Sequence, residues 1–353
     1  MTAPDADTVR ERLEQIEDPH LGADIVSLGL LGDVTVEDET ETVHVTLGLG
    51  APYSPTETAI AGEVRRALDD LSYDVRLTAR VDRGVDPEET VLPNVKNIIA
   101  VASGKGGVGK STIASNLAVG LADLGARVGL FDADVYGPNV PQMVGTDKQP
   151  RVTEAGTMVP PEAHGVELMS MEFLLDESAP AIWRGPMVHK VLTQLWEDVE
   201  WGRGGDLDYM IVDLPPGTGD TQLTMLQSIP VSGAVIVTTP QDVALDDASR
   251  GMRMFGEHET PVLGIVENMS TFVCPDCGSS HDIFDSGGGE SFAEETGMPH
   301  LGTIPLDPAI RENGRPAILD DGETANALRK FVEATADMQG VVHRRRESER
   351  AVQ

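Results

Sequence analysis

A glycine-rich segment carries the residue types that bind phosphate. It reads Gly104-Lys105-Gly106-Gly107-Val108-Gly109-Lys110-Ser111-Thr112. Glycines let backbone N–H groups turn toward phosphate oxygens, Lys110 brings a positive charge to the β- and γ-phosphates, and the Ser111 hydroxyl can bind Mg²⁺. The segment follows an apolar run at residues 98–102 and precedes a helical pattern at residues 115–124. This order of strand, loop and helix predicts an ATP-binding phosphate loop.

Two further apolar runs end in aspartates. Asp132 and Asp134 follow the first run, and Asp213 follows the second. Ligands of open α/β sheets bind at the carboxyl ends of the strands, so these carboxylates should lie beside the phosphate loop. We expect Asp213 to bind Mg²⁺ through water, and Gly217 to bring a backbone N–H near the γ-phosphate.

The chain has two cysteines, Cys274 and Cys277, which excludes a disulfide framework. Their spacing supplies half of a four-coordinate metal site. Two copies of the chain related by a two-fold axis would supply four thiolates, which suits a bridging 4Fe–4S cluster. Zinc could use the same thiolates, with His281 adding a nitrogen ligand within one chain. A thioredoxin-like redox pair is the third alternative.

The composition is strongly acidic, with 59 Asp and Glu against 26 Lys and Arg and a net charge of −33 over 353 residues. Such self-repulsion weakens a compact state in dilute buffer, whereas molar salt shortens the Debye length to about 3 Å. We therefore expect a salt-accumulating, haloarchaea-like host. A nucleic-acid partner is not expected, because its phosphate backbone would be repelled. The first residues lack a signal-peptide pattern and no apolar run could span a bilayer, which predicts a cytoplasmic protein without a membrane partner.

The first part of the chain, residues 1–84, has the pattern of a small α/β domain. Apolar periodicity predicts helices near residues 9–16 and 60–71, and alternation predicts strands at residues 43–49 and 75–81.

The second predicted domain carries the phosphate loop. The polar segment Arg83-Gly84-Val85-Asp86-Pro87-Glu88-Glu89 contains Gly and Pro, which predicts a linker that we place at residues 85–94. Residues 95–342 alternate strand-like and helix-like runs, which predicts a mostly parallel sheet covered on both faces, the α/β fold of a P-loop NTPase. We expect residues 343–353, a run of Arg and Glu, to form a disordered tail.

Lys105 makes the phosphate loop more specific. The spacing of Lys105 and Lys110 resembles the deviant Walker A loop of the MinD/ParA/nitrogenase iron-protein class of ATPases. The resemblance implies a homodimer with ATP at its interface, in which Lys105 reaches the nucleotide of the partner subunit and stabilises transition-state charge. The alternative is an ordinary surface lysine.

Within that class, three segments resemble the Mrp/ApbC branch of iron–sulfur carrier ATPases. They are Gly137-Pro138 after the acidic pair, Trp183-Arg184-Gly185-Pro186-Met187, and Leu263-Gly264-Ile265-Val266-Glu267-Asn268-Met269-Ser270. The resemblance implies a carrier that hydrolyses ATP slowly with Mg²⁺, holds a labile 4Fe–4S cluster at Cys274 and Cys277 of a dimer, and passes it from cluster-assembly donors to apo iron–sulfur proteins.

The family pattern also assigns individual residues. It implies that Asn268 pairs with the adenine edge, although Asn268 could simply end its strand. It favours Asp134 over Asp132 for orienting the attacking water. Asp132 could instead be an outer partner of Mg²⁺ or a helix cap.

Residues 1–84 resemble the iron–sulfur assembly domain often fused to these ATPases, through Asp18-Pro19-His20-Leu21-Gly22 and Val26-Ser27-Leu28-Gly29-Leu30. One position departs from the family. Ser54 stands where a cysteine is usual, and a hydroxyl is a poor ligand for iron or sulfide. We expect this domain to act in docking, with Ser54 capping the helix that follows.

Two other functions stay open from the sequence. A MinD/ParA-like positioning ATPase would use the arginines of residues 343–353 on a membrane or nucleoid. A zinc-stabilised ATP switch would carry metal at the thiols without a cluster.

Overall fold

The computed structural model describes residues 4–81, 83–84, 91–135, 137–174, 193, 195–274, 277, 279–283, 287–308 and 314–351. The chain divides into two compact units. Unit 1 comprises residues 1–84 together with 336–353, and unit 2 comprises residues 85–335. Each unit has its own sheet and is described by itself.

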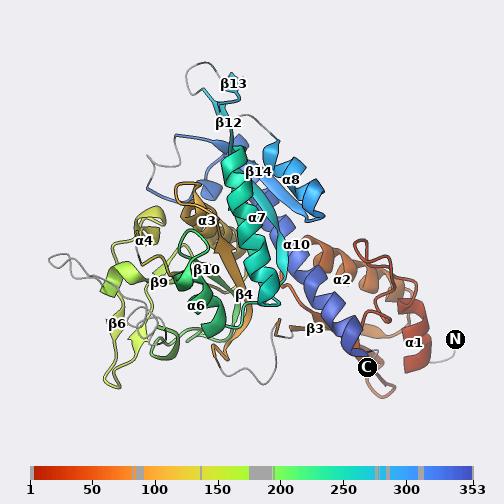
Figure 1. The fold of residues 1–353 in the computed structure, drawn as a ribbon. Coiled ribbons are helices and arrows are strands. Elements are labelled where there is room, and N and C mark those ends of the chain that lie inside the picture. Colours follow the sequence, from red (N-terminus) through yellow and green to blue (C-terminus); the bar gives the residue numbers. More distant parts are fainter. Residues whose placement is uncertain are drawn as a thin grey trace. The chain divides into compact units, whose positions relative to one another are not determined.

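Unit 2 is built on a nine-stranded sheet with the order β13-β12-β11-β4-β10-β5-β9-β8, and β14 also pairs with β12 (Figure 1). The strands are β4 (Val95–Ala102), β5 (Val128–Asp132), β8 (Glu162–Ala163), β9 (Val166–Ser170), β10 (Leu207–Asp213), β11 (Gly233–Thr238), β12 (Val262–Val273), β13 (Ser280–His281) and β14 (His300–Leu306). The pairings are parallel except for those of β8 and β13. The predicted mostly parallel sheet is therefore confirmed.

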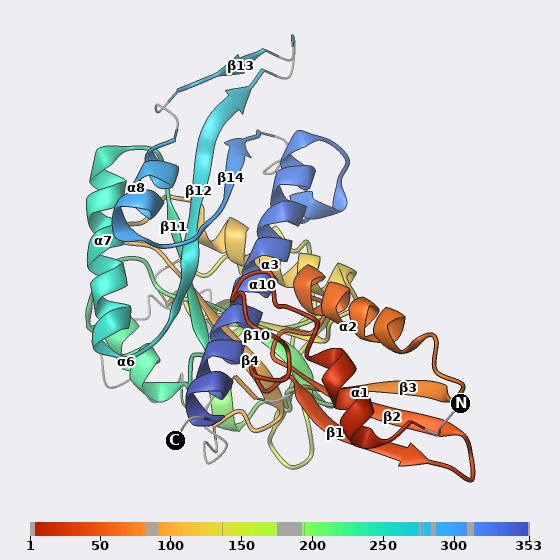
Figure 2. The same ribbon diagram turned by 90° about the vertical axis from the view of Figure 1, so that its right-hand side faces the viewer.

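Both faces of this sheet are covered. The central strands β5, β10 and β11 are mainly apolar, and every one of their residues is buried. Figure 2 shows α6 (Asp220–Ser228) and α7 (Asp242–Glu257) on one face and α3 (Lys110–Asp123) on the other. Smaller elements complete the unit: α4 (Val140–Met143), α8 (Gly288–Thr296), the 3₁₀ turns η1 (Met171–Leu174) and η2 (Ala317–Leu319), and the pair β6 (Arg151–Val152) and β7 (Met158–Val159).

Unit 1 contains a three-stranded sheet in the order β1-β2-β3. Its elements are α1 (Ala6–Leu13), β1 (Leu31–Glu37), β2 (Thr42–Leu49), α2 (Pro55–Leu68) and β3 (Asp74–Val81). Strand β2 pairs antiparallel with β1 and parallel with β3. The predicted helices and strands are present, and β1 is an element that the sequence pattern did not predict.

The start of α2 confirms the predicted cap. The Ser54 side chain accepts a hydrogen bond from the Glu57 N–H at 3.2 Å. The Glu57 carboxylate turns back and accepts from the N–H groups of Gly50 and Ala51. This arrangement is a variant of the capping box, in which the serine and the glutamate three residues later satisfy backbone donors near the helix start.

The prediction of a disordered tail is wrong for residues 343–351. Helix α10 (Glu323–Ala351) runs through them, and its residues from 336 onward pack with unit 1, not with the predicted ATPase domain to residue 342. The physical reason is burial of charge: Arg344 is 1% exposed and forms ion pairs with Asp18 and Glu57. No helix among the described residues, α10 included, is long and apolar enough to cross a membrane.

Candidate functional site

The phosphate loop lies where the motif requires it, between β4 and α3. Gly107 and Gly109 both have φ of +82°, a conformation that side chains disfavour. Gly109 is also closed in by Asn268, since a Cβ atom at Gly109 would lie 2.1 Å from the Asn268 Nδ2 atom. The glycine spacing of the motif thus has a local reason at these two positions.

Lys110 is the first residue of α3 and forms a buried ion pair with Asp213 at the end of β10. The Lys110 Nζ atom lies 2.5 Å from the Asp213 Oδ1 atom, and neither side chain is more than 6% exposed. Burial raises the pKa of Asp213, and the charge of Lys110 is the largest opposing effect. The Lys110 ammonium therefore opposes the effect of burial, because its charge favours the ionised form of the carboxylate.

The second carboxylate oxygen of Asp213 supports the predicted Mg²⁺ role. Its Oδ2 atom is buried without a hydrogen-bond partner among the described residues. The Ser111 hydroxyl lies 3.5 Å from the Lys110 Nζ atom, at the same end of α3. A carboxylate oxygen and a hydroxyl are donors that fit Mg²⁺ and its bound water.

Asp132 lies opposite Asp213 in the pairing of β5 with β10. Its Oδ2 atom accepts hydrogen bonds from the N–H groups of Asn139 and Val140 and from the Ser170 hydroxyl. Its Oδ1 atom accepts from the Asp134 N–H at 3.2 Å. Burial raises the pKa of Asp132 to about 7, and the neighbouring Asp213 carboxylate adds to this. These contacts fit the helix-cap alternative, because Asp132 fixes the loop that leads into α4.

Asp134 is less enclosed than Asp132, with 8% of its surface exposed. Its Oδ1 atom accepts from the Gly137 N–H at 3.2 Å. Ser170, which orients Asp132, belongs to no recognised motif, and only the pairing of β5 with β9 brings it there.

Three other predicted residues are engaged by the protein itself. The Lys105 Nζ atom donates to the Gln241 side chain at 3.3 Å. The Gly217 N–H donates to the Ser103 carbonyl at 2.9 Å, and the Asn268 amide donates to the Val108 carbonyl at 2.8 Å. Asn268 therefore stabilises the phosphate loop in this structure. Gly217 directs its N–H toward Ser103, the residue immediately before the phosphate loop.

The two cysteines lie between β12 and β13, which project from the edge of the sheet (Figure 2). Cys274 is half-buried and Cys277 is exposed. The Cys274 N–H donates to the Ser279 carbonyl at 3.0 Å, and hydrogen bonds with Ser279 lower the pKa of the Cys277 thiol. A lowered thiol pKa favours the thiolate, which is the metal-binding form.

Among the described residues, no group of three His, Cys, Asp or Glu side chains is placed to hold a metal ion. His281 therefore does not complete a zinc site with both thiols of its own chain in this part of the structure. The segment Trp183–Met187 lies outside the described residues.

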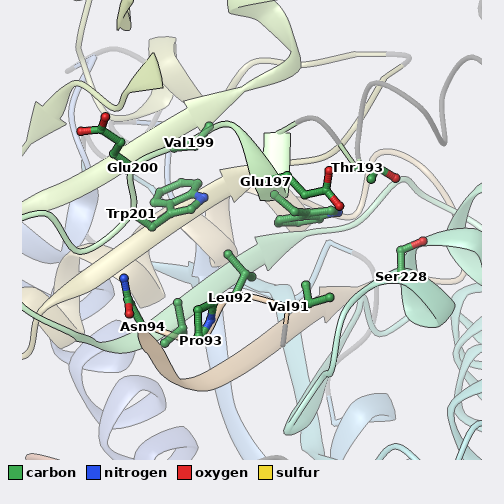
Figure 3. A pocket seen from close by; sticks show the side chains of 12 residues that line it. Val91, Leu92, Pro93, Asn94, Thr193, Glu197, Val199, Glu200, Trp201 and Ser228 are labelled. Carbon is green, nitrogen blue, oxygen red and sulfur yellow. The ribbon is translucent and has the colours of Figure 1, made fainter. Parts of the chain in front are cut away.

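Two cavities flank the sheet of unit 2. One, of about 390 Å³, lies beside α3 and is lined by polar side chains that include Thr112, Asn116 and Arg315. The other, of about 410 Å³, lies between Trp201 and Val199 on one side and Val91, Leu92 and Pro93 on the other (Figure 3). It adjoins Val95 at the amino end of β4, whereas the phosphate loop follows the carboxyl end of the same strand, so it is not the nucleotide site.

Some arginines of residues 343–353, the segment that a positioning ATPase would use on a membrane or nucleoid, form contacts within the protein. Arg344 is buried, and Arg346 donates to the Gly84 carbonyl. Arg345 and Arg350 remain exposed on α10. This distribution removes most of the support for a positioning ATPase.

Comparison with known proteins finds a family match in each of the two units. Residues 94–338 match the family described as "NUBPL iron-transfer P-loop NTPase", and residues 6–78 match the family described as "Iron-sulfur cluster assembly protein". The iron–sulfur cluster carrier protein of Synechocystis is 45% identical over 91% of this chain and 93% of its own length. That of Deinococcus radiodurans is 46% identical over 94% of each chain.

A solved structure agrees with this result. The nucleotide-binding protein of Archaeoglobus fulgidus in complex with ADP is 36% identical, with a TM-score of 0.57 over 65% of this chain and 91% of that chain.

Proposed function

Because this chain belongs to the iron–sulfur cluster carrier family of P-loop ATPases, we propose that it carries a labile 4Fe–4S cluster between two subunits. In this proposal ATP and Mg²⁺ bind at residues 104–112, the cluster is held by thiolates, and apo-proteins receive it. Hydrolysis changes the geometry of the subunit interface, and this change determines whether the cluster is retained or released.

The observation that carries the proposal is the position of the thiol pair. Cys274 and Cys277 lie at a projecting edge, one of them exposed, with no third ligand beside them among the described residues. A 4Fe–4S cluster needs four thiolates. A second copy of the chain supplies the other two if the edges meet across a two-fold axis.

The nucleotide roles follow from the charges on the sheet edge. Lys110 would contact the β- and γ-phosphates in place of Asp213, and Asp213 and Ser111 would be the residues that hold Mg²⁺. Bound Mg²⁺ would neutralise phosphate charge. Asp134 orients water, while Asp132 keeps the loop between β5 and α4 in place.

Two further steps require local rearrangement. Lys105 exchanges Gln241 for the phosphates bound by the partner subunit, and the Gly217 N–H exchanges the Ser103 carbonyl for the γ-phosphate. Asn268 recognises adenine with the part of its amide that Val108 does not use. Each of the two exchanges replaces a protein hydrogen bond with one to phosphate, so ATP binding and loop rearrangement are coupled.

The test is anaerobic reconstitution with iron and sulfide in high salt, followed by absorption spectroscopy and quantitation per dimer. The proposal predicts about four irons and four sulfides per dimer, lost in the Cys274→Ala/Cys277→Ala pair. The holo-protein should then activate an apo 4Fe–4S enzyme. Zinc without sulfide, or iron that persists in the double variant, would overturn the carrier proposal and favour the zinc-stabilised switch.

A further inference from the structure

The helix that follows the phosphate loop packs closely against α10. Gly120 of α3 lies at this contact, and a Cβ atom there would be 2.5 Å from Ile318 and 2.7 Å from Val332. Ile318 belongs to η2 and Val332 to the first half of α10. Because glycine lets the backbone of α3 approach so closely, a shift of α3 must be accommodated by η2 and α10.

Hydrogen bonds follow the same route. The Asn116 side chain of α3 accepts from the Ile318 N–H at 2.9 Å. The Arg329 guanidinium of α10 donates to the carbonyls of Ile318 and Asp320 at 3.0 and 2.7 Å. The segment η2 is therefore bonded to α3 on one side and to α10 on the other, all within unit 2.

The second half of the same helix holds the start of α2 in unit 1. The Asp337 carboxylate accepts from the Ser54 hydroxyl at 2.6 Å and from the Thr56 N–H at 2.9 Å. The Thr56 N–H is one of the donors that a helix start leaves without a partner within its own helix. A negative charge at this position is also favoured by the helix dipole.

Arg344 provides the second contact. Its Nη1 atom lies 2.9 Å from the Glu57 Oε1 atom, and its Nε atom lies 2.6 Å from the Asp18 Oδ2 atom. The contact with Asp18 is an ion pair by distance, although its atoms do not align as a hydrogen bond. The backbone also approaches closely, since a Cβ atom at Gly50 would lie 2.3 Å from His343.

We propose that α10 transmits the nucleotide state of the phosphate loop to the α2 start of unit 1. Its 29 residues form one uninterrupted helix, which bears on α3 with its first half and on Ser54, Thr56 and Glu57 with its second. The inference rests on ATP binding at the loop, which is part of the proposed function, and is independent of the cluster. In this proposal α10 has two states, and the relative affinity of the loop for ATP and ADP differs between them. The size of that difference in affinity sets how far a change of nucleotide alters the contacts of residues 336–351.

Three backbone amides report this contact directly. The N–H groups of Gly50 and Ala51 donate to Glu57, which Arg344 holds, and the Thr56 N–H donates to Asp337. Their hydrogen exchange in the full chain should differ about fivefold or more between the states with Mg-ADP and with a slowly hydrolysed Mg-ATP analogue. Calorimetry on the same sample establishes that each nucleotide is bound.

The matched variants interrupt the helix or its contact. Glu333 is exposed near the middle of α10, so Glu333→Pro breaks the helix there while Glu333→Ala preserves it. Arg344→Gln removes the buried cation, and Arg345→Gln changes its exposed neighbour. We expect the nucleotide-dependent difference to disappear in Glu333→Pro and in Arg344→Gln and to persist in both controls.

The proposal fails if nucleotide is bound in the wild type and the three amides exchange equally in both states. It also fails if Arg344→Gln retains the full difference, a result that does not depend on whether Glu333→Pro folds. A chain that shows no calorimetric nucleotide binding contradicts the proposed function itself. Loss of the cluster in the Cys274→Ala/Cys277→Ala background should leave the exchange difference unchanged.

Discussion

Lys110 and Asp213 form a buried ion pair, with 2.5 Å between the Lys110 Nζ and Asp213 Oδ1 atoms. The lysine that should contact phosphate is thus held by the carboxylate that should face Mg²⁺. Phosphate and Mg²⁺ together can replace this pair, because phosphate supplies a negative partner for Lys110 and Mg²⁺ supplies a positive partner for Asp213. Either ligand alone would leave a buried charge without its partner.

Replacing Asp213 tests this relationship. In Asp213→Asn the Lys110 cation loses its charged partner, and we expect the free energy of unfolding of the nucleotide-free chain to fall by about 3 kcal/mol. Mg²⁺-dependent ATP hydrolysis should fall by about 100-fold or more. Urea unfolding and phosphate release measure the two effects.

Asp208→Asn is the matched control, because Asp208 lies on the same strand and pairs with Lys96 at 3.1 Å away from the phosphate loop. It should leave hydrolysis within about twofold of wild type, because Asp208 lies at the start of β10 and Asp213 at its end, beside the phosphate loop. Equal loss of hydrolysis in both variants would show that the site is disturbed through folding alone.

Lys105→Ala tests whether this lysine acts on the partner subunit's nucleotide. The Lys105 ammonium donates an exposed 3.3 Å hydrogen bond to the Gln241 side chain, so little stability should be lost. We expect hydrolysis to fall by about 1,000-fold, as for loss of an arginine finger, with ATP affinity changed much less. Lys148→Ala removes another lysine of unit 2, and hydrolysis should be unaffected; retention of activity in Lys105→Ala would identify Lys105 as an ordinary surface lysine.

Ser54→Cys places a thiol at the buried start of α2. Because Ser54 is fully buried and bonded to Asp337, the new thiol should react with a thiol reagent at least about tenfold more slowly than one at exposed Thr58 in Thr58→Cys. Both substitutions are made in the Cys274→Ala/Cys277→Ala background, and labelling is followed by absorbance. Equally rapid labelling at both positions would mean that α10 does not cover Ser54 in solution.

Glu57 should make the stability of unit 1 depend on pH. Burial raises the pKa of Glu57 from 4.5 to about 7, against the opposing charge of Arg344 and the N–H groups of Ala51 and Gly50. Because the folded-state pKa is the higher one, the associated stability is present in full below about pH 4.5 and is lost as the pH rises to about 7. The change is on the order of 3 kcal/mol.

The measurement compares wild type with Glu57→Gln, whose side chain cannot ionise, by urea unfolding between pH 5 and 8. The difference in unfolding free energy between the two chains should shift across this range in favour of the variant. Asp18, Asp337 and His343 also lie at this contact and are unchanged in the variant, so the difference isolates Glu57. Glu63→Gln, at an exposed position of α2, should follow the wild type at every pH.

The phosphate loop and its supporting strand and helix were predictable because their reasons are local. Gly107 and Gly109 need positive φ, Lys110 opens the helix, and the apolar runs that end in Asp132 and Asp213 fix which edge of a parallel sheet the carboxylates reach. Such features depend on a few consecutive residues and on the fixed geometry of strands.

Tertiary structure alone decided which of these groups contact each other. Lys110 and Asp213 form their ion pair although they are 103 residues apart in the sequence. Asn268 and Gly217 donate to protein carbonyls, and those contacts depend on where neighbouring strands end. The last helix shows the limit most clearly. From the sequence, its arginines predict a solvated tail. Arg344 is nevertheless buried, because the carboxylate of Glu57, 287 residues earlier in the chain, lies against it. A charge is buried only where an opposite charge meets it, and sequence spacing does not show that meeting.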